Sequence, residues 1–299
     1  MRTSHKEMRR KINAEVSKIT DEELFSSAAF AAYLTDIAEA VTKRYKRKLR
    51  VETIYDTSEN VMIACTNNRN ILINTGNYIS WSMPYRKLKA ESILGLVGHE
   101  VGHMLFTNFR ISETYFSELS YGRLYPQMEL SEEEQESFTE VTDYFKTGTE
   151  AQKQAILKAA KLLLNILEDA YIEARICDRY TGRFATGINL NNIRFTEMMP
   201  SVTEQLTNGC YRFSVFCNLL NQYCRSGDIN NRDGYAGELL DLFYDVLPLV
   251  DDTIYDEDMK RRCYAVNRIL LMVWAYIKEV TEKAEEEENT SETLQKLNK

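Results

Sequence analysis

Hydrophobic residues recur every three or four positions along most of this chain, which is the spacing of amphipathic helices. Between residues 150 and 180, for example, Ile156, Ala160, Leu163 and Leu167 fall on one helical face. The chain has only four prolines in 299 residues, which favours long uninterrupted helices. The same spacing predicts further helices over residues 21–49, 86–106, 192–206, 210–225, 235–246 and 256–283.

A different pattern interrupts the helices near residues 51–75. Short β-prone runs at 51–55, 61–65 and 71–73 predict three strands, and the Asn-rich segment 66–70 predicts a hairpin turn between the last two. Residues 108–150 lack a clear period, so we expect them to be irregular, either a lid over a cleft or a solvated insertion. Together these patterns predict a mostly helical α+β fold with one small sheet.

The charge balance, 37 basic residues against 45 acidic ones, gives a net charge of −8. This argues against a nucleic-acid-binding protein that works through an overall basic field. A basic cluster at residues 43–50 could contact phosphate, but cations are also favourable at the C-terminus of a helix. Nucleic acid is therefore not the partner that the sequence predicts.

The sequence also bears on location and on cysteine chemistry. No apolar run approaches the roughly 18–20 residues of a membrane span, and the basic N-terminal segment lacks the apolar part of a signal peptide. We therefore expect a cytoplasmic protein that does not use a membrane. The six cysteines contain no CxxC pair, so we expect reduced thiols and no cysteine-based zinc site.

Two of the three histidines lie in one pentapeptide, HEVGH, at residues 99–103. Positions i and i+4 place His99 and His103 on one face of a helix, as two ligands of a tetrahedral zinc require. Glu100 lies beside that face, where it can act as a general base toward water held by the metal. The alternative is an amphipathic helix with two core histidines, but the segment around them is almost wholly apolar, and unpartnered imidazoles there would be costly.

Three glycines, Gly95, Gly98 and Gly102, lie in this predicted helix, and each disfavours it by roughly 1 kcal/mol relative to alanine. We expect them to allow close approach of another backbone or of a substrate.

The HEVGH motif resembles that of the zincin metallopeptidases. The order of elements, a hairpin strand, the HExxH helix and then a helix with acidic residues, is also similar to theirs. The resemblance implies one bound Zn²⁺ and a small sheet, near residues 51–75, packed on the HExxH helix. In zincins the strand before this helix commonly forms the sheet edge that pairs with bound peptide, and Asn70–Thr75 is the segment in that place.

The third zinc ligand is expected to be a carboxylate. No histidine follows His103, and His5 lies in a polar N-terminal segment. An otherwise apolar helix at residues 162–176 (LLLNILEDAYIEARI) carries several acidic residues. This helix resembles the glutamate-donating helix of gluzincin-like proteins, especially bacterial and phage-borne proteins classed as peptidases and often fused to von Willebrand factor A domains.

By that resemblance Glu168 is the third ligand, and Asn165, Asp169 and Glu173 are the candidates for groups that orient the ligands. From the residues alone, Asp169 and Glu173 stay open as alternative ligands. Zinc proteolysis also needs a group that stabilises the oxyanion, and with no further histidine in the predicted core this must be a tyrosine or an arginine. The candidates for it are Tyr171, Arg175 and Tyr180.

The sequence therefore predicts a zinc metallopeptidase that acts on a peptide or protein substrate. The alternative is a non-catalytic module that a metal stabilises within a larger assembly, with a partner or fused domain at the C-terminus. A structural zinc needs no general base and closes its fourth position with a protein ligand, so Glu100 favours the enzyme. The expected domains are a metallopeptidase core at 1–180, a helical subdomain at 181–283 and a disordered acidic tail at 284–299.

Overall fold

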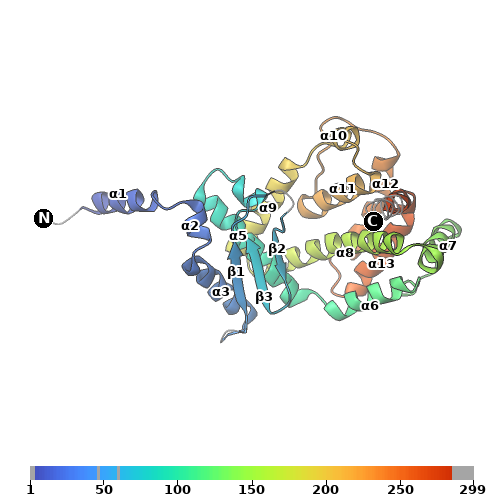
Figure 1. Cartoon of the computed structure of the whole chain (residues 1–299), viewed down its shortest axis with the longest axis horizontal. Coiled ribbons are helices and arrows are strands. Elements are labelled where there is room, and N and C mark those ends of the chain that lie inside the picture. The colour runs from blue at the N-terminus through green and yellow to red at the C-terminus, as the bar shows by residue number, and fades with distance from the viewer. Residues whose placement is uncertain (1–3, 46–47, 59–60, 285–299) are drawn as a thin grey trace, which may run out of the picture. The chain divides into compact units, whose positions relative to one another are not determined.

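The computed structural model of the chain describes residues 4–45, 48–58 and 61–284, and Figure 1 labels its elements in chain order. The described chain is mostly helical with one small sheet, which confirms the predicted α+β class. The predicted acidic tail lies outside the described residues from position 285 onward. None of the helices that the structure describes is both long enough and apolar enough to cross a membrane.

The strands that the structure describes lie in the N-terminal half of the chain, between helices. The elements are α1 (His5–Val16), α2 (Asp21–Phe25), α3 (Ala28–Thr42), β1 (Arg50–Ile54), β2 (Ala64–Thr66), β3 (Asn70–Asn74), α4 (Tyr78–Trp81), α5 (Arg86–Phe106) and α6 (Phe109–Ser120). They are followed by α7 (Glu132–Thr147), α8 (Glu150–Arg179), α9 (Arg183–Met198), α10 (Val202–Thr207), α11 (Arg212–Ser226), α12 (Glu238–Thr253) and α13 (Met259–Met272). Residues 274–284 are also helical.

The chain divides into two compact units, each made of two stretches. The first unit comprises Met1–Phe106 and Arg175–Asn191, and the second comprises Thr107–Ala174 and Asn192–Lys299. Helices α8 and α9 therefore each contribute residues to both units. The boundary expected near residue 180 lies inside the first unit, because Ile176 at the end of α8 packs in the core of that unit.

The first unit contains a three-stranded sheet in the order β1-β3-β2. Strand β1 runs parallel to β3, and β2 runs antiparallel to it. The predicted hairpin between β2 and β3 is confirmed, and Asn67 shapes its turn by accepting from the backbone N–H groups of Arg69 (3.0 Å) and Asn70 (2.7 Å). Asn68 in this turn has a φ of 64°, a left-handed conformation that asparagine adopts more readily than most residues.

The position of β3 corrects one expectation. The segment Asn70–Thr75 was expected to form the edge of the sheet, but Ile71 of β3 faces Val51 of β1 on one side and Thr66 of β2 on the other. The hairpin folds β2 back along β3, so the earlier strand of the hairpin becomes the edge. In the described sheet, β1 and β2 are the two edge strands.

Helix α5 has the bounds that the sequence predicted and is the central helix of the first unit. It packs on α3, β2 and β3, and Val97 and Val101 lie in the same core as Ile71 and Ile73 of the sheet. The helix that carries HEVGH is therefore packed against the sheet along its buried side.

Two of the glycines expected to allow close approach do so within the first unit. A Cβ atom at Gly95 would lie 2.3 Å from the carbonyl carbon of Gly187 in α9, so the two helices cross with their backbones in contact. A Cβ at Gly98 would lie 2.9 Å from the ring of Phe184. For Gly95 the expectation of an approaching backbone is confirmed.

The second unit is formed by helices. Residues 108–150 are not irregular as expected, because they contain α6 and α7. The acidic segment that looked like a solvated loop begins with a capping box, in which the Ser131 side chain accepts from the N–H of Glu134 and Glu134 accepts from the N–H of Ser131. Acidic residues also suit the first turn of a helix. The predicted helix at 192–206 is interrupted by Pro200, after which Ser201 caps α10.

All six cysteines are free thiols, as predicted.

Candidate metal centre

The two histidines of the HEVGH motif lie one turn apart on α5. Both are half-buried, and the centroids of their rings are 4.9 Å apart with the ring planes at 78°. Glu100 follows His99 directly and is only 5% exposed. The two imidazoles therefore lie side by side, as the helical spacing predicted, and the glutamate that follows the first of them is buried.

The position of α5 is fixed by contacts two turns before His99. The Asn191 side chain of α9 donates from Nδ2 to the carbonyl oxygen of Ser92 (2.9 Å), and its Oδ1 accepts from the Ser92 hydroxyl (2.6 Å). Ser92 Oγ also lies 2.7 Å from Ser80 Oγ. All three side chains are buried, so these hydrogen bonds and the contact at Gly95 hold α5 in one rotation about its axis.

Glu100 is buried on α5, a helix that packs on strand β2. Partial burial raises the pKa of the Cys65 thiol in β2, and the negative charge of Glu100 raises it further. The charge of Glu100 therefore acts on a side chain of the edge strand.

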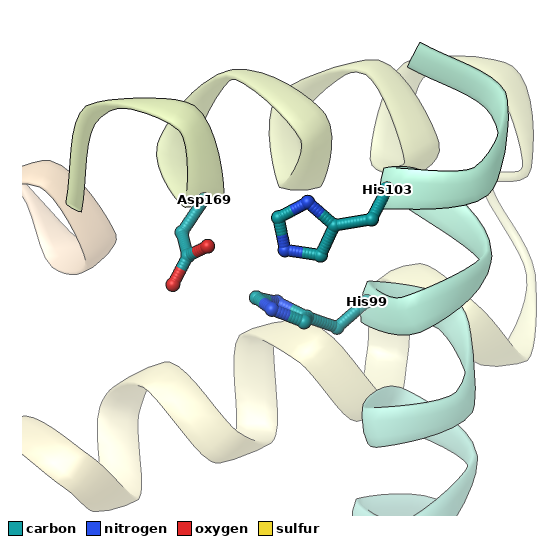
Figure 2. A group of neighbouring side chains, drawn as sticks. All are labelled: His99, His103 and Asp169. Carbon is teal, nitrogen blue, oxygen red and sulfur yellow. The ribbon is translucent and has the colours of Figure 1, made fainter. Parts of the chain in front are cut away.

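Asp169 of α8 joins the two histidines. One ligand atom from each of His99, His103 and Asp169 lies within 4.8 Å of the others, and Figure 2 shows the carboxylate directed toward the rings. Asp169 is seven residues, or about two turns, before Ile176, so both are on the same face of α8. Among the described residues, these three form a group that could hold a metal ion.

Glu168, the expected third ligand, is not part of this group and has a different environment. Its Oε1 accepts from the Thr107 hydroxyl (2.8 Å), and its Oε2 accepts from Nε of Arg262 in α13 (2.7 Å). Both Glu168 and Arg262 are buried. Each carboxylate oxygen of Glu168 therefore has a donor within the second unit, whereas the carboxylate grouped with the two histidines is that of Asp169.

Glu173 and Asn165, the other candidates for orienting the ligands, differ in burial. Glu173 is buried, and both it and Asp169 form ion pairs with Arg225 of α11. These contacts fit a residue that helps to orient a metal ligand. Asn165 is exposed, which does not fit that role. Sequence reasoning did not find Arg225, because it lies 52 residues after Glu173 and no spacing signals the pair.

The structure also constrains the three oxyanion candidates. Tyr171 is buried with the guanidinium of Arg262 3.9 Å above its ring, and the Tyr180 hydroxyl donates to the carbonyl of Val41 at 3.4 Å. Both tyrosines therefore have structural contacts of their own. Arg175 lies over the ring of Phe106, the last residue of α5 and three residues after His103, at 5.6 Å.

Comparison of the chain with protein-family models, curated proteins and solved structures gives no significant match.

Proposed function

We propose that this chain is a zinc-dependent hydrolase of peptide bonds, in which His99, His103 and Asp169 hold the metal and Glu100 is the general base. The observation that carries the proposal is the group of two imidazoles and one carboxylate beside a buried glutamate of an HExxH helix. The proposal keeps the chemistry that the motif predicts and replaces Glu168 by Asp169.

The donor set fits zinc. Two imidazole nitrogens and a carboxylate oxygen are the ligands of many catalytic zinc sites, which leave the fourth position open. Zinc bonds of about 2.0–2.2 Å separate the ligand atoms of a tetrahedral site by roughly 3.3–3.6 Å, and the three ligand atoms here lie within 4.8 Å of one another. When bound, zinc supplies Lewis acidity that polarises a carbonyl group and lowers the pKa of water.

Glu100 manages the proton in this proposal. Its carboxylate accepts a proton from the water that attacks the scissile carbonyl, and it gives the proton to the leaving amine when the C–N bond breaks. A carboxylate that is 5% exposed has little competition from bulk water for this transfer. Arg175 is the candidate for stabilising negative charge on the carbonyl oxygen.

The sheet of the first unit supports a peptide as the substrate. Strand β2 is an edge strand and packs on α5, and the charge of Glu100 reaches Cys65 in the middle of that strand. An extended peptide can add to such an edge through main-chain hydrogen bonds. This would place a scissile bond along β2 on the side of Glu100.

The test is a digestion of a synthetic peptide library by the zinc-loaded protein, with the products read by mass spectrometry. Glu100→Gln should lose roughly 10²–10⁴-fold in cleavage rate while keeping zinc, because the amide cannot accept the proton. Glu113→Gln, an exposed position on α6, is the matched control and should cleave like the wild type. Full activity of Glu100→Gln would refute the mechanism, and zinc binding without any cleavage would favour the non-catalytic module.

A further inference from the structure

Arg225 of α11 contacts two acidic residues of α8 at once. Its Nη2 donates to Oδ2 of Asp169 and its Nη1 donates to Oε1 of Glu173, each at 3.2 Å. The side chains of Arg225 and Asp169 are 19% and 20% exposed, and that of Glu173 is 8% exposed. These contacts lie within the second unit, so they do not depend on any residue of α5.

The guanidinium is held from several directions. Its Nε donates to Oδ1 of Asn221 one turn earlier on α11 (2.6 Å), and Nη1 also donates to Oδ1 of Asn192 (3.1 Å). Asn192 in turn donates from Nδ2 to Oε2 of Glu173 (2.7 Å). A planar guanidinium fixed in this way keeps its N–H groups in one orientation, which a flexible ammonium cannot do.

The network also has an electrostatic role. Asp169 and Glu173 are four residues apart on α8, where two like charges lie close together and repel. Arg225 offsets that repulsion, and its contact with Oδ2 of Asp169 restricts how the carboxylate can rotate.

We propose that Arg225 is a positioning residue for the metal centre, which holds the carboxylate of Asp169 in the orientation that the ion requires. The inference rests on the proposed metal binding by His99, His103 and Asp169. Residues that orient a metal ligand typically contribute 10–100-fold to metal affinity. Arg225 is expected to contribute within that range, through Asp169.

The test measures zinc affinity of the metal-stripped full-length chain by competition with a chromophoric chelator. Arg225→Met should weaken zinc binding by roughly 10–100-fold. Arg225→Lys keeps the charge but cannot contact both carboxylates in the same way, so its affinity should fall between those of the wild type and Arg225→Met. If Arg225→Met does not fold, Arg225→Lys alone decides, and wild-type affinity for it overturns the proposal.

Two further variants serve as controls for this measurement. Arg212→Met removes another arginine of α11, which pairs with Glu279 and lies over Tyr276, and it should lower thermal stability without changing zinc affinity. His99→Ala should abolish binding, and if it does not, the proposed metal centre itself fails. If His99→Ala loses zinc while Arg225→Met binds it as tightly as the wild type, or more tightly because a cation has been removed, only the role of Arg225 is refuted.

Discussion

Arg262 and Glu168 form a salt bridge that solvent does not reach. Nε of Arg262 donates to Oε2 of Glu168 at 2.7 Å, and the two side chains are 0% and 4% exposed. The same guanidinium lies 3.9 Å above the ring of Tyr171. Glu168 therefore compensates a charge in the core of the second unit, and its burial reflects folding of that unit.

This relationship predicts a stability effect for Glu168→Gln. The amide leaves the buried guanidinium of Arg262 without its counter-charge, and breaking a buried ion pair costs about 3–5 kcal/mol. The free energy of unfolding of the metal-free protein should fall by that amount in urea titrations. Glu118→Gln is the control, because its pair with Arg123 is open to solvent (59% exposed for Arg123 and 33% for Glu118) and should contribute less than about 1 kcal/mol. A stable Glu168→Gln protein that has lost zinc would restore Glu168 as the ligand.

Asp169→Asn should have the opposite profile. The amide is nearly isosteric but carries no charge, so zinc affinity should fall by more than the roughly 100-fold expected for a residue behind the ligands. The free energy of unfolding of the metal-free protein should change little, because Asp169 is half-buried and Arg225 retains its ion pair with Glu173. Asp178→Asn, an exposed position on the same helix, is the control. Unchanged zinc affinity in Asp169→Asn would remove this residue from the metal centre.

The sequence could predict the part of this site that lies on a single helix. His99, Glu100 and His103 are neighbours on α5, so helical spacing is enough to place them together. The choice between Glu168 and Asp169 as the third ligand could not be made from helical spacing alone. Adjacent residues point about 100° apart around a helix, and the rotation of α8 depends on a partner such as Arg262, which is 94 residues away in sequence.

The fold divides in the same way. The hairpin β2–β3 was predictable from its turn residues, but the pairing of β1 with β3 puts β3 in the centre of the sheet, and only long-range contacts determine that order. Helix α7 was missed although a local signal existed. Ser131 followed by Glu134 is a capping box, and the acidic run between them is favourable at a helix N-terminus.

The crossing of α5 and α9 predicts that Gly95→Ala destabilises the protein. Alanine is normally better than glycine inside a helix by roughly 1 kcal/mol. At Gly95 its Cβ would lie 2.3 Å from the backbone of Gly187, so α9 must move, and overpacking of this kind costs about 1–3 kcal/mol or more. Gly182→Ala is the matched control, since a Cβ there meets nothing within 4 Å. The midpoint of thermal unfolding should fall for Gly95→Ala only, and an unchanged midpoint would contradict the close crossing.

Asp21 at the start of α2 predicts a pH dependence of stability. Burial raises the pKa of this carboxyl, but hydrogen bonds from Lys89 (2.9 Å) and Arg86 (2.6 Å) of α5 outweigh it, and the pKa is lowered overall. Because the pKa is lower in the folded state, the ionised carboxylate stabilises the fold at pH values above the unfolded pKa, which is near 3.8. This stabilisation is lost as the pH falls through the folded-state pKa. Asp21→Asn should therefore be less stable at pH 7, by about 1 kcal/mol, and lose less stability on acidification below pH 4. Parallel acid curves for the two metal-free proteins would contradict this.

Zinc itself should stabilise the folded chain, because the ligands come from different helices and are brought together only by folding. Free zinc at about 100 times its dissociation constant adds roughly 2.7 kcal/mol to the free energy of unfolding, or about 5 °C in the midpoint for a chain of this size. The shift should disappear when His99 and His103 are both replaced by alanine. It should persist in Glu100→Gln, because the general base is not a ligand, so this variant separates metal binding from hydrolysis. Calcium, which prefers oxygen ligands, should give no shift. A zinc shift of equal size in the double histidine variant would mean that zinc binds elsewhere, and the proposed centre would be wrong.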